Sequence, residues 1–136
     1  MVDLKDIIDS HDRIRHLIHR TPILTNESLN KLIDAKLFFK CENFQKTGAF
    51  KIRGASNAVA LLTQNELERG IATASSGNHG AALAKAVTIR NGKITVIMPN
   101  DSSLNKVENV KRNGGKIIWC EPFQQSREKV LNDFVR

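Results

Sequence analysis

The C-terminal half of the chain alternates short apolar runs with helical patterns, and this alternation constrains the fold more than any other feature. Short runs that contain β-branched side chains favour strands. Each run is followed by a segment of helical length, and strand–helix–strand units build parallel sheets covered on both faces. The sequence therefore predicts an α/β fold, a three-layer parallel sheet with flanking helices. The expected strands are Ile71–Ala74, Ile94–Met98 and Ile117–Cys120, and the expected helices are Asn78–Arg90, Ser103–Asn113 and Arg127–Val135.

The N-terminal half has a less regular pattern. A helix is expected from Asp3, a good N-cap residue, to about Arg20, because Pro22 disfavours helical geometry in the residue before it. Thr63 and Glu66 have the spacing of a capping box, which predicts a short helix after them. The remaining expected elements are helices at Ser28–Ile33 and Ala49–Leu62 and a strand at Leu37–Phe39.

The composition is that of an ordinary globular domain. The 136 residues are 40% hydrophobic and 26% charged, which is enough for one domain with its own core and excludes a disordered chain. No apolar run approaches the roughly 18 residues that span a bilayer. The early charges of Asp3, Lys5 and Asp6 leave no room for the apolar core of a signal peptide. The cytoplasm is therefore the expected location.

The net charge of +7 raises the question of a nucleic-acid partner. The basic residues are scattered, however, and no aromatic residues alternate with the densest stretch, Lys106 to Lys116, so no nucleic-acid surface is predicted. Cys41 and Cys120 share no metal-type spacing, which predicts reduced thiols instead of a disulfide framework. No metal site is expected. His11, His16 and His19 belong to the expected first helix, where His11 and His19 are two turns apart, and no second histidine lies at ligand spacing from His79.

The segment ASSGNHGAAL, residues 74–83, joins an expected strand to an expected helix. Ligands of α/β folds bind at the carboxyl ends of parallel strands, and the N–H groups that begin a helix attract carboxylates and phosphates. The segment is neither a dinucleotide fingerprint nor a P-loop. One alternative is that Ser76 or Asn78 only caps the helix. Four polar side chains gather here, more than a cap requires: Ser75, Ser76, Asn78 and His79.

Lys51 lies between Phe50 and Ile52 at the expected start of a helix. Apolar surroundings disfavour the charged form of a lysine, and the neutral amine is the form that attacks a carbonyl group. A lysine that forms a Schiff base is therefore one interpretation of this pattern, which the residues alone do not favour over the other. The alternative is a surface lysine whose stem packs on its apolar neighbours while its ammonium stays in water.

Two segments, FFKCENFQKTGAFKIRGASNAV and SSGNHGAALA, resemble the pyridoxal-phosphate enzymes of the tryptophan synthase β fold, also called fold type II. More narrowly, the chain resembles serine racemase and the serine/threonine dehydratases, from HRTPILT at His19 to CEPFQQSREKV at Cys120. Cysteine synthases and threonine synthase typically have Lys-Asp-Arg where this chain has Lys51-Ile52-Arg53. The resemblance implies pyridoxal 5′-phosphate as cofactor and serine or threonine as substrate.

The resemblance also implies catalytic and cofactor-binding roles. Lys51 would form the Schiff base with the cofactor and move protons at Cα on one face of the substrate. Ser76 would handle the Cα proton on the opposite face. Phe50 would pack against the cofactor ring, and Asn78 would donate a hydrogen bond to the 3′ oxygen of the cofactor.

Two further sites follow from the same resemblance. Ser75, Asn78 and His79 belong to the loop that would receive the substrate carboxylate. Lys46 and Thr47 match a pair that contacts a nucleotide in animal serine racemases. No metal site is implied.

The family's phosphate-binding loop would lie beyond the position of Arg136, and the eight glycines of this chain include no such run. We therefore expect residues 1–48 to belong to the large domain of a longer enzyme, residues 49–136 to form a small α/β domain, and the rest of the large domain to be absent. The expected function is the N-terminal portion of a serine/threonine ammonia-lyase or serine racemase, weakly active or inactive alone and part of a homo-oligomer. The alternative is a non-catalytic α/β module that binds a partner chain or a small anion.

Overall fold

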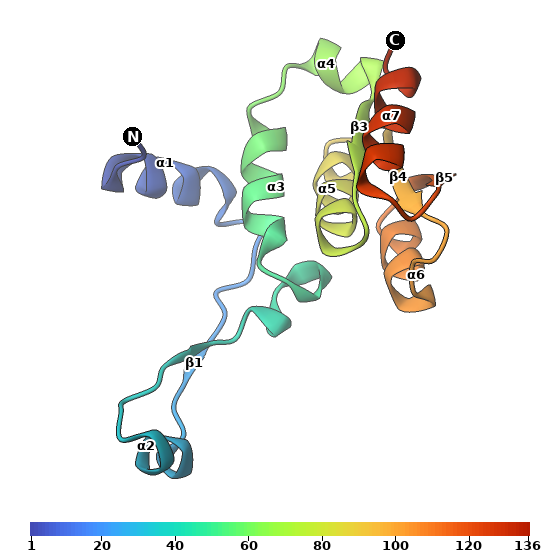
Figure 1. The fold of residues 1–136 in the computed structure, drawn as a ribbon. Helices are drawn as coiled ribbons and strands as arrows, with labels where there is room; N and C mark the ends of the chain where they lie inside the picture. Colours follow the sequence, from blue (N-terminus) through green and yellow to red (C-terminus); the bar gives the residue numbers. More distant parts are fainter.

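The computed structural model describes residues 1–136, apart from the side chain of Gln124. Figure 1 shows an N-terminal arm, residues 1–45, that extends away from helix α3, while the later elements gather on the other side of α3. The helices are α1 (Leu4–Ile14), α2 (Glu27–Ile33), η1 (Glu42–Phe44), η2 (Lys46–Gly48), α3 (Lys51–Ala60), α4 (Gln64–Arg69), α5 (Asn78–Ile89), α6 (Leu104–Arg112) and α7 (Gln124–Phe134). The strands are β1 (Ile23–Leu24), β2 (Phe39–Lys40), β3 (Ile71–Ala74), β4 (Ile94–Pro99) and β5 (Lys116–Cys120).

Strands β3, β4 and β5 form a parallel sheet in that order. The register pairs Ile71 with Ile94, and Val96 of the central strand with Ile117. Every residue of β4 is buried, as expected for a strand that is covered on both faces. Helices α5 and α6 cover one face and α7 covers the other, so that β3 lies between α5 and α7 in Figure 1. The predicted parallel sheet is confirmed.

Helix α5 lies close to the sheet because its buried face consists of small residues. A Cβ atom built on Gly80 would come within 2.8 Å of Cγ1 of Val96 on β4. Alanines form most of the remaining buried face of α5, and α3 packs along this helix. The core around α5 is closed by side chains that are at most 2% exposed, namely Ile52, Val59, Leu67, Val87, Val96, Met98 and Val110.

Helix α1 ends at Ile14, so the predicted end near Arg20 is wrong. After Ile14 the chain leaves the helix through a tight turn, in which the backbone N–H of Leu17 donates to the carbonyl of Ile14 at 2.7 Å. The side chain of Gln45 accepts a hydrogen bond from the backbone N–H of His19 and donates one to the carbonyl of His19, both at 2.8 Å. A side chain 26 residues further along the chain therefore holds the backbone of this segment at His19.

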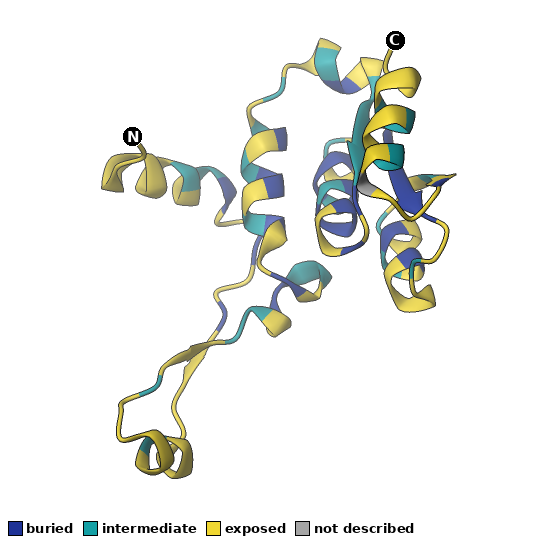
Figure 2. Ribbon diagram, in the orientation of Figure 1, coloured by how far each residue is buried: buried dark blue, intermediate teal, exposed yellow. Residues whose placement is uncertain are grey.

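The predicted strand at Leu37–Phe39 is shifted toward the C-terminus. Strand β2 covers Phe39–Lys40 and pairs antiparallel with β1, a strand that the sequence did not predict. Both strands are exposed and α2 buries none of its residues, so this part of the arm is mostly exposed in Figure 2. It leaves many apolar side chains in solvent, among them Ile23, Leu24, Leu32, Ile33, Phe38 and Phe39.

The other predicted elements are confirmed to within a few residues. The capping box of Thr63 and Glu66 opens α4 as expected, whereas α7 begins at Gln124, before the predicted start at Arg127. Cys41 and Cys120 are both free, and burial raises the pKa of the Cys120 thiol. Within the described part of the chain, the helices are too short or too polar to cross a membrane.

Replacing Gly80 with alanine should destabilise the protein by about 1–3 kcal/mol, because the new methyl group would overlap Val96 in a packed core. Gly54→Ala is the matched control, since Gly54 is also helical but a Cβ atom there meets nothing within 4 Å. The control should be as stable as the original chain or up to about 1 kcal/mol more stable. Urea unfolding followed by circular dichroism measures both, and equal stability of the two variants would contradict the close approach of α5 to β4.

Candidate active site

The turn between β3 and α5 is organised by the buried side chain of Ser75. Its Oγ accepts hydrogen bonds from the backbone N–H groups of Gly77, at 3.2 Å, and Gly80, at 2.9 Å. Gly77 is the N-cap of α5 and makes no side-chain cap. The sequence-based alternative that Ser76 or Asn78 caps this helix is therefore wrong, because Ser75 supplies the acceptor.

Capping by Ser75 leaves the other polar side chains of the turn available. Ser76, Asn78 and His79 are exposed, and none of them forms a hydrogen bond with another described side chain or backbone group. The hydroxyl oxygen of Ser75 is already engaged, so this residue holds the turn in shape. Its predicted contact with the substrate carboxylate stays a prediction.

Lys51 is the first residue of α3, and Phe50 is the N-cap of that helix. Both side chains are exposed, and the ammonium of Lys51 lies 5.2 Å from the centre of the Phe50 ring. The apolar surroundings expected from the sequence are thus limited to the Phe50 ring, because the rest of the Lys51 side chain faces solvent. An attractive contact between the cation and the ring face keeps the two side chains together.

Helices α3 and α5 bring Lys51 and the serine-rich turn to the same part of the molecule. The two helices pack along each other on the same face of the sheet. Lys51 and Asn78 are their first residues, and Figure 1 shows both helices beginning at the same end of the pair. The amine of Lys51 is therefore on the same side of the sheet as Ser76, Asn78 and His79. The catalytic roles of these residues stay predictions.

Thr47 has an unusual environment. Its φ of 67° is rare for a β-branched residue, and its Oγ1 is buried with no hydrogen-bond partner among the described residues. Its carbonyl accepts a hydrogen bond from Nδ2 of Asn109 at 3.2 Å. A cavity of about 400 Å³ beside it is lined by Thr47, Gly48, Asn105, Asn109, Arg112 and Asn113. Lys46 does not line this cavity, and the contact of Lys46 and Thr47 with a nucleotide stays a prediction.

Sequence reasoning missed Glu42, which anchors the start of α3. Arg53 donates from Nε at 2.9 Å and from Nη2 at 2.7 Å to the two oxygens of the Glu42 carboxylate. The hydroxyl of Thr21 donates to the same carboxylate at 2.5 Å. The hydrogen bond from Arg53 is the main reason why the pKa of Glu42 falls to about 2. A separation of 11 residues between Glu42 and Arg53 fits no regular pairing within a helix, so the charge pattern alone could not reveal this ion pair.

Comparison with known proteins identifies the family. The model for "Pyridoxal-phosphate dependent enzyme" matches residues 14–136. The chain belongs to this family. The resemblance noted in the sequence is thereby confirmed, and so is fold type II, the parallel sheet with flanking helices that its solved members share.

Individual members of this pyridoxal-phosphate family match almost the whole chain. The serine racemase of Arabidopsis thaliana is 49% identical over 130 residues, which cover 96% of this chain and 39% of that protein. The beta-hydroxyaspartate dehydratase of Paracoccus denitrificans is 48% identical over 127 residues, 93% of this chain and 40% of that protein. The structure of maize serine racemase superposes with a TM-score of 0.93 at 44% identity, over 97% of this chain and 40% of that one. This chain therefore spans about two fifths of the length of the relatives it matches.

The two serines of the turn should respond differently to replacement by alanine. Ser75→Ala leaves two N–H groups without their acceptor and should lower the free energy of unfolding by about 1–3 kcal/mol. Ser76→Ala removes an exposed hydroxyl and should change it by less than about 0.5 kcal/mol. Urea unfolding of the two variants measures the difference, and a larger loss in Ser76→Ala would refute the assignment of Ser75 as the residue that holds the turn.

The ion pair of Glu42 should make stability depend on acid pH. Because the folded pKa of about 2 lies below the ordinary value of 4.5, the stabilisation by this carboxylate is present above pH 4.5 and is lost as the pH falls toward 2. Glu42→Gln should cost about 1–3 kcal/mol at pH 7, as for hydrogen bonds to charged groups, and the gap to the original chain should close between these two pH values. Glu108→Gln, at an exposed position, is the control. A gap that does not change with pH would argue against the ion pair.

Proposed function

We propose that this chain is the N-terminal portion of a pyridoxal-phosphate-dependent enzyme that acts on small hydroxy amino acids, as a serine/threonine dehydratase or a serine racemase. The observation that carries the proposal is the gathering of Lys51, Ser76, Asn78 and His79, all exposed and unbonded among the described groups, where α3 and α5 begin. Polar side chains that begin two packed helices but have no hydrogen-bond partner of their own are suited to a ligand. The racemase and dehydratase relatives support the reaction class.

The residues present fit the ring and the aldehyde end of pyridoxal phosphate. Lys51 offers an exposed amine, the Phe50 ring stands next to it, and Asn78 offers an unpaired amide. These three residues would hold the cofactor. When bound, pyridoxal phosphate acts as an electron sink that stabilises negative charge at the Cα of an amino acid. The residues of the turn between β3 and α5 are not proposed to bind the phosphate of the cofactor.

The side chains of the chain itself would then position the substrate and move its protons. The N-terminus of α5, with Asn78 and His79, favours a carboxylate because its N–H groups and dipole attract anions. Lys51 would take or return the Cα proton on one face of the substrate and Ser76 on the other. Loss of the β-hydroxyl gives dehydration, whereas return of the proton to the opposite face gives racemisation. Ser75 supports both outcomes by fixing the turn.

The remaining expectations concern the complete protein. We propose that residues 1–48 belong to a large domain and residues 49–136 to a small α/β domain. The arm supports this division, because its apolar side chains at Ile23, Leu24 and Phe39 are exposed and need covering. The same exposed side chains support a homo-oligomer. A cytoplasmic location stays a prediction.

The chain alone should bind the cofactor at Lys51 but turn over little substrate. Misplacement of about 1 Å can lower a rate ~100-fold, so turnover should be at least ~100-fold below that of a complete serine racemase. The purified chain is incubated with pyridoxal phosphate and L-serine, and pyruvate and D-serine are measured. Borohydride reduction followed by mass spectrometry shows which lysine carries the cofactor.

Two variants decide the outcome of this experiment. Lys51→Ala should abolish the preferred labelling, whereas Lys111→Ala, at an exposed position on α6, should not change it. Equal labelling of many lysines, unaffected by Lys51→Ala, would remove the case for Lys51 and favour a non-catalytic module. Turnover at the level of a complete racemase would show that the expected inactivity is wrong.

A further inference from the structure

A cavity of about 460 Å³ lies between the N-terminal arm and α3, and its lining is almost entirely basic. Three separate segments contribute: α1 with the turn after it, strand β2 and helix α3. The lining residues are His11, Arg15, Ile18, His19, Arg20, Lys40 and Arg53. Among the described residues none of those that line the cavity carries a carboxylate, and Glu42, which is bonded to Arg53, is the acidic group next to it. The surplus of basic side chains favours an anion.

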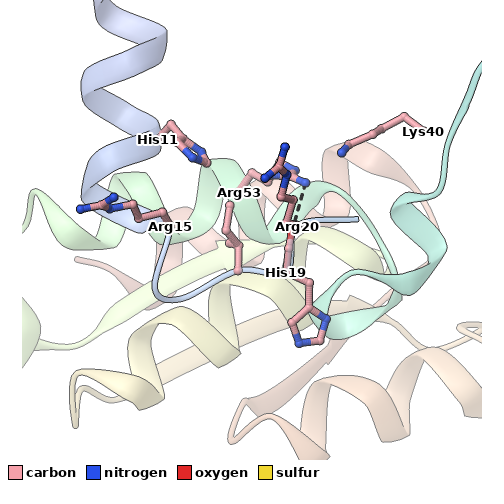
Figure 3. A pocket seen from close by; sticks show the side chains of 7 residues that line it. His11, Arg15, His19, Arg20, Lys40 and Arg53 are labelled. Atoms are coloured by element: carbon pink, nitrogen blue, oxygen red, sulfur yellow. Dashed lines mark hydrogen bonds between the residues drawn. The ribbon is translucent and has the colours of Figure 1, made fainter. Parts of the chain in front are cut away.

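Three charged groups point into the same space. Figure 3 shows the guanidinium groups of Arg20 and Arg53 and the ammonium of Lys40 turned toward one another, whereas Arg15 points away. Such an arrangement brings like charges together and is unfavourable when nothing neutralises them. A bound anion would relieve this repulsion.

The hydrogen bonds of these cations show how much charge remains uncompensated. Glu42 neutralises Arg53, but it uses only Nε and Nη2 of that guanidinium. Lys40 donates one hydrogen bond, at 2.7 Å, to the neutral carbonyl of Thr21. Arg20 is exposed and forms no hydrogen bond or ion pair with any other described group. The charge of Lys40 also acts on Glu42, where it helps to lower the pKa of that carboxylate. One carboxylate thus faces the charges of Lys40 and Arg53, and Arg20 has no described partner, so the group keeps a net positive charge and free donors on Arg20, Lys40 and Nη1 of Arg53.

We propose that this cavity is a binding site for a small molecule that carries a phosphate or diphosphate group. Guanidinium groups bind phosphate oxygens in pairs, and the two arginines and the lysine offer donors from different directions, which suits a tetrahedral dianion better than a planar monoanionic carboxylate. The volume of about 460 Å³ exceeds that of an inorganic phosphate and falls in the range of small-molecule sites.

The site is separate from Lys51. Residues two apart on a helix point to different sides of it, so Arg53 faces away from the side of α3 that carries Lys51. The cavity is also separate from the one beside Thr47, with which it shares no lining residue. Binding here and cofactor attachment at Lys51 can therefore be tested independently.

Pyrophosphate is the probe, in a chloride buffer without phosphate, and isothermal titration calorimetry measures its affinity. Arg20→Gln/Lys40→Gln removes two charges from the cavity, and Lys111→Gln/Lys116→Gln removes two from exposed positions outside it. The first variant should weaken binding ~10-fold or more. The second should change it less than about 2-fold, because salt screens the attraction of charges that lie far from the cavity. Arg20→Gln alone, at an exposed residue without a described partner, keeps the test usable if the double variant fails to fold.

Amide chemical shifts of the original chain give a second readout. Pyrophosphate should shift signals from the turn after α1, from β2 and from the first turn of α3. Equal weakening in both double variants, or shifts spread over α6, would overturn the proposal in favour of non-specific attraction to a chain of net charge +7. Labelling of Lys51 by pyridoxal phosphate should be unchanged in Arg20→Gln/Lys40→Gln, so failure of the anion site and failure of the proposed function give different results.

Discussion

The close approach of α5 to the parallel sheet is the constraint on which the rest of the structure depends. Gly80 lets the helix lie against Val96, and the alanines beyond it let α3 pack along the other side. Larger side chains at these positions would move α5 outward, and α3 would move with it. Lys51 and the turn that contains Ser76 and Asn78 begin these two helices, so the spacing of the candidate active site is set by small buried residues that take no part in its chemistry.

The carboxylate of Glu42 plays the corresponding role on the side of the arm. It joins Thr21, before β1, to Arg53 on α3, while Gln45 holds the backbone of His19 from both sides. Most of the arm beyond these contacts is exposed, and α2 buries nothing. These polar contacts fix where α3 begins together with Ile14 and Ile18, the two buried apolar side chains that the arm adds to the core. The low pKa of Glu42 results mainly from its hydrogen bond with Arg53, one of the contacts that hold α3.

The parallel sheet could be predicted from the sequence because each of its strands has a local signature. Short apolar runs followed by helical segments determine strand type, order of elements and the position of the turn after β3. The short strands β1 and β2 could not be predicted in the same way, since a two-residue pairing between distant segments determines them. The early end of α1 at Ile14 has no local signal such as a glycine or proline, because the first proline is Pro22. Within the site, polar side chains at Ser76, Asn78 and His79 were predicted from their spacing. The sequence did not show that the hydroxyl of Ser75 accepts backbone hydrogen bonds instead, because the burial of a serine cannot be read from its residue type.

Arg53 takes part both in the ion pair with Glu42 and in the wall of the basic cavity. One edge of its guanidinium is fixed by Glu42 and so helps to position α3, and the other edge faces the cavity that Arg20 and Lys40 also line. Two hydrogen bonds to Glu42 hold the guanidinium of Arg53 in place, so that less conformational freedom is lost when its remaining N–H groups bind a ligand. The same ion pair that orders the start of α3, and with it Lys51, therefore also preorganises the wall of the cavity on the other side of the helix.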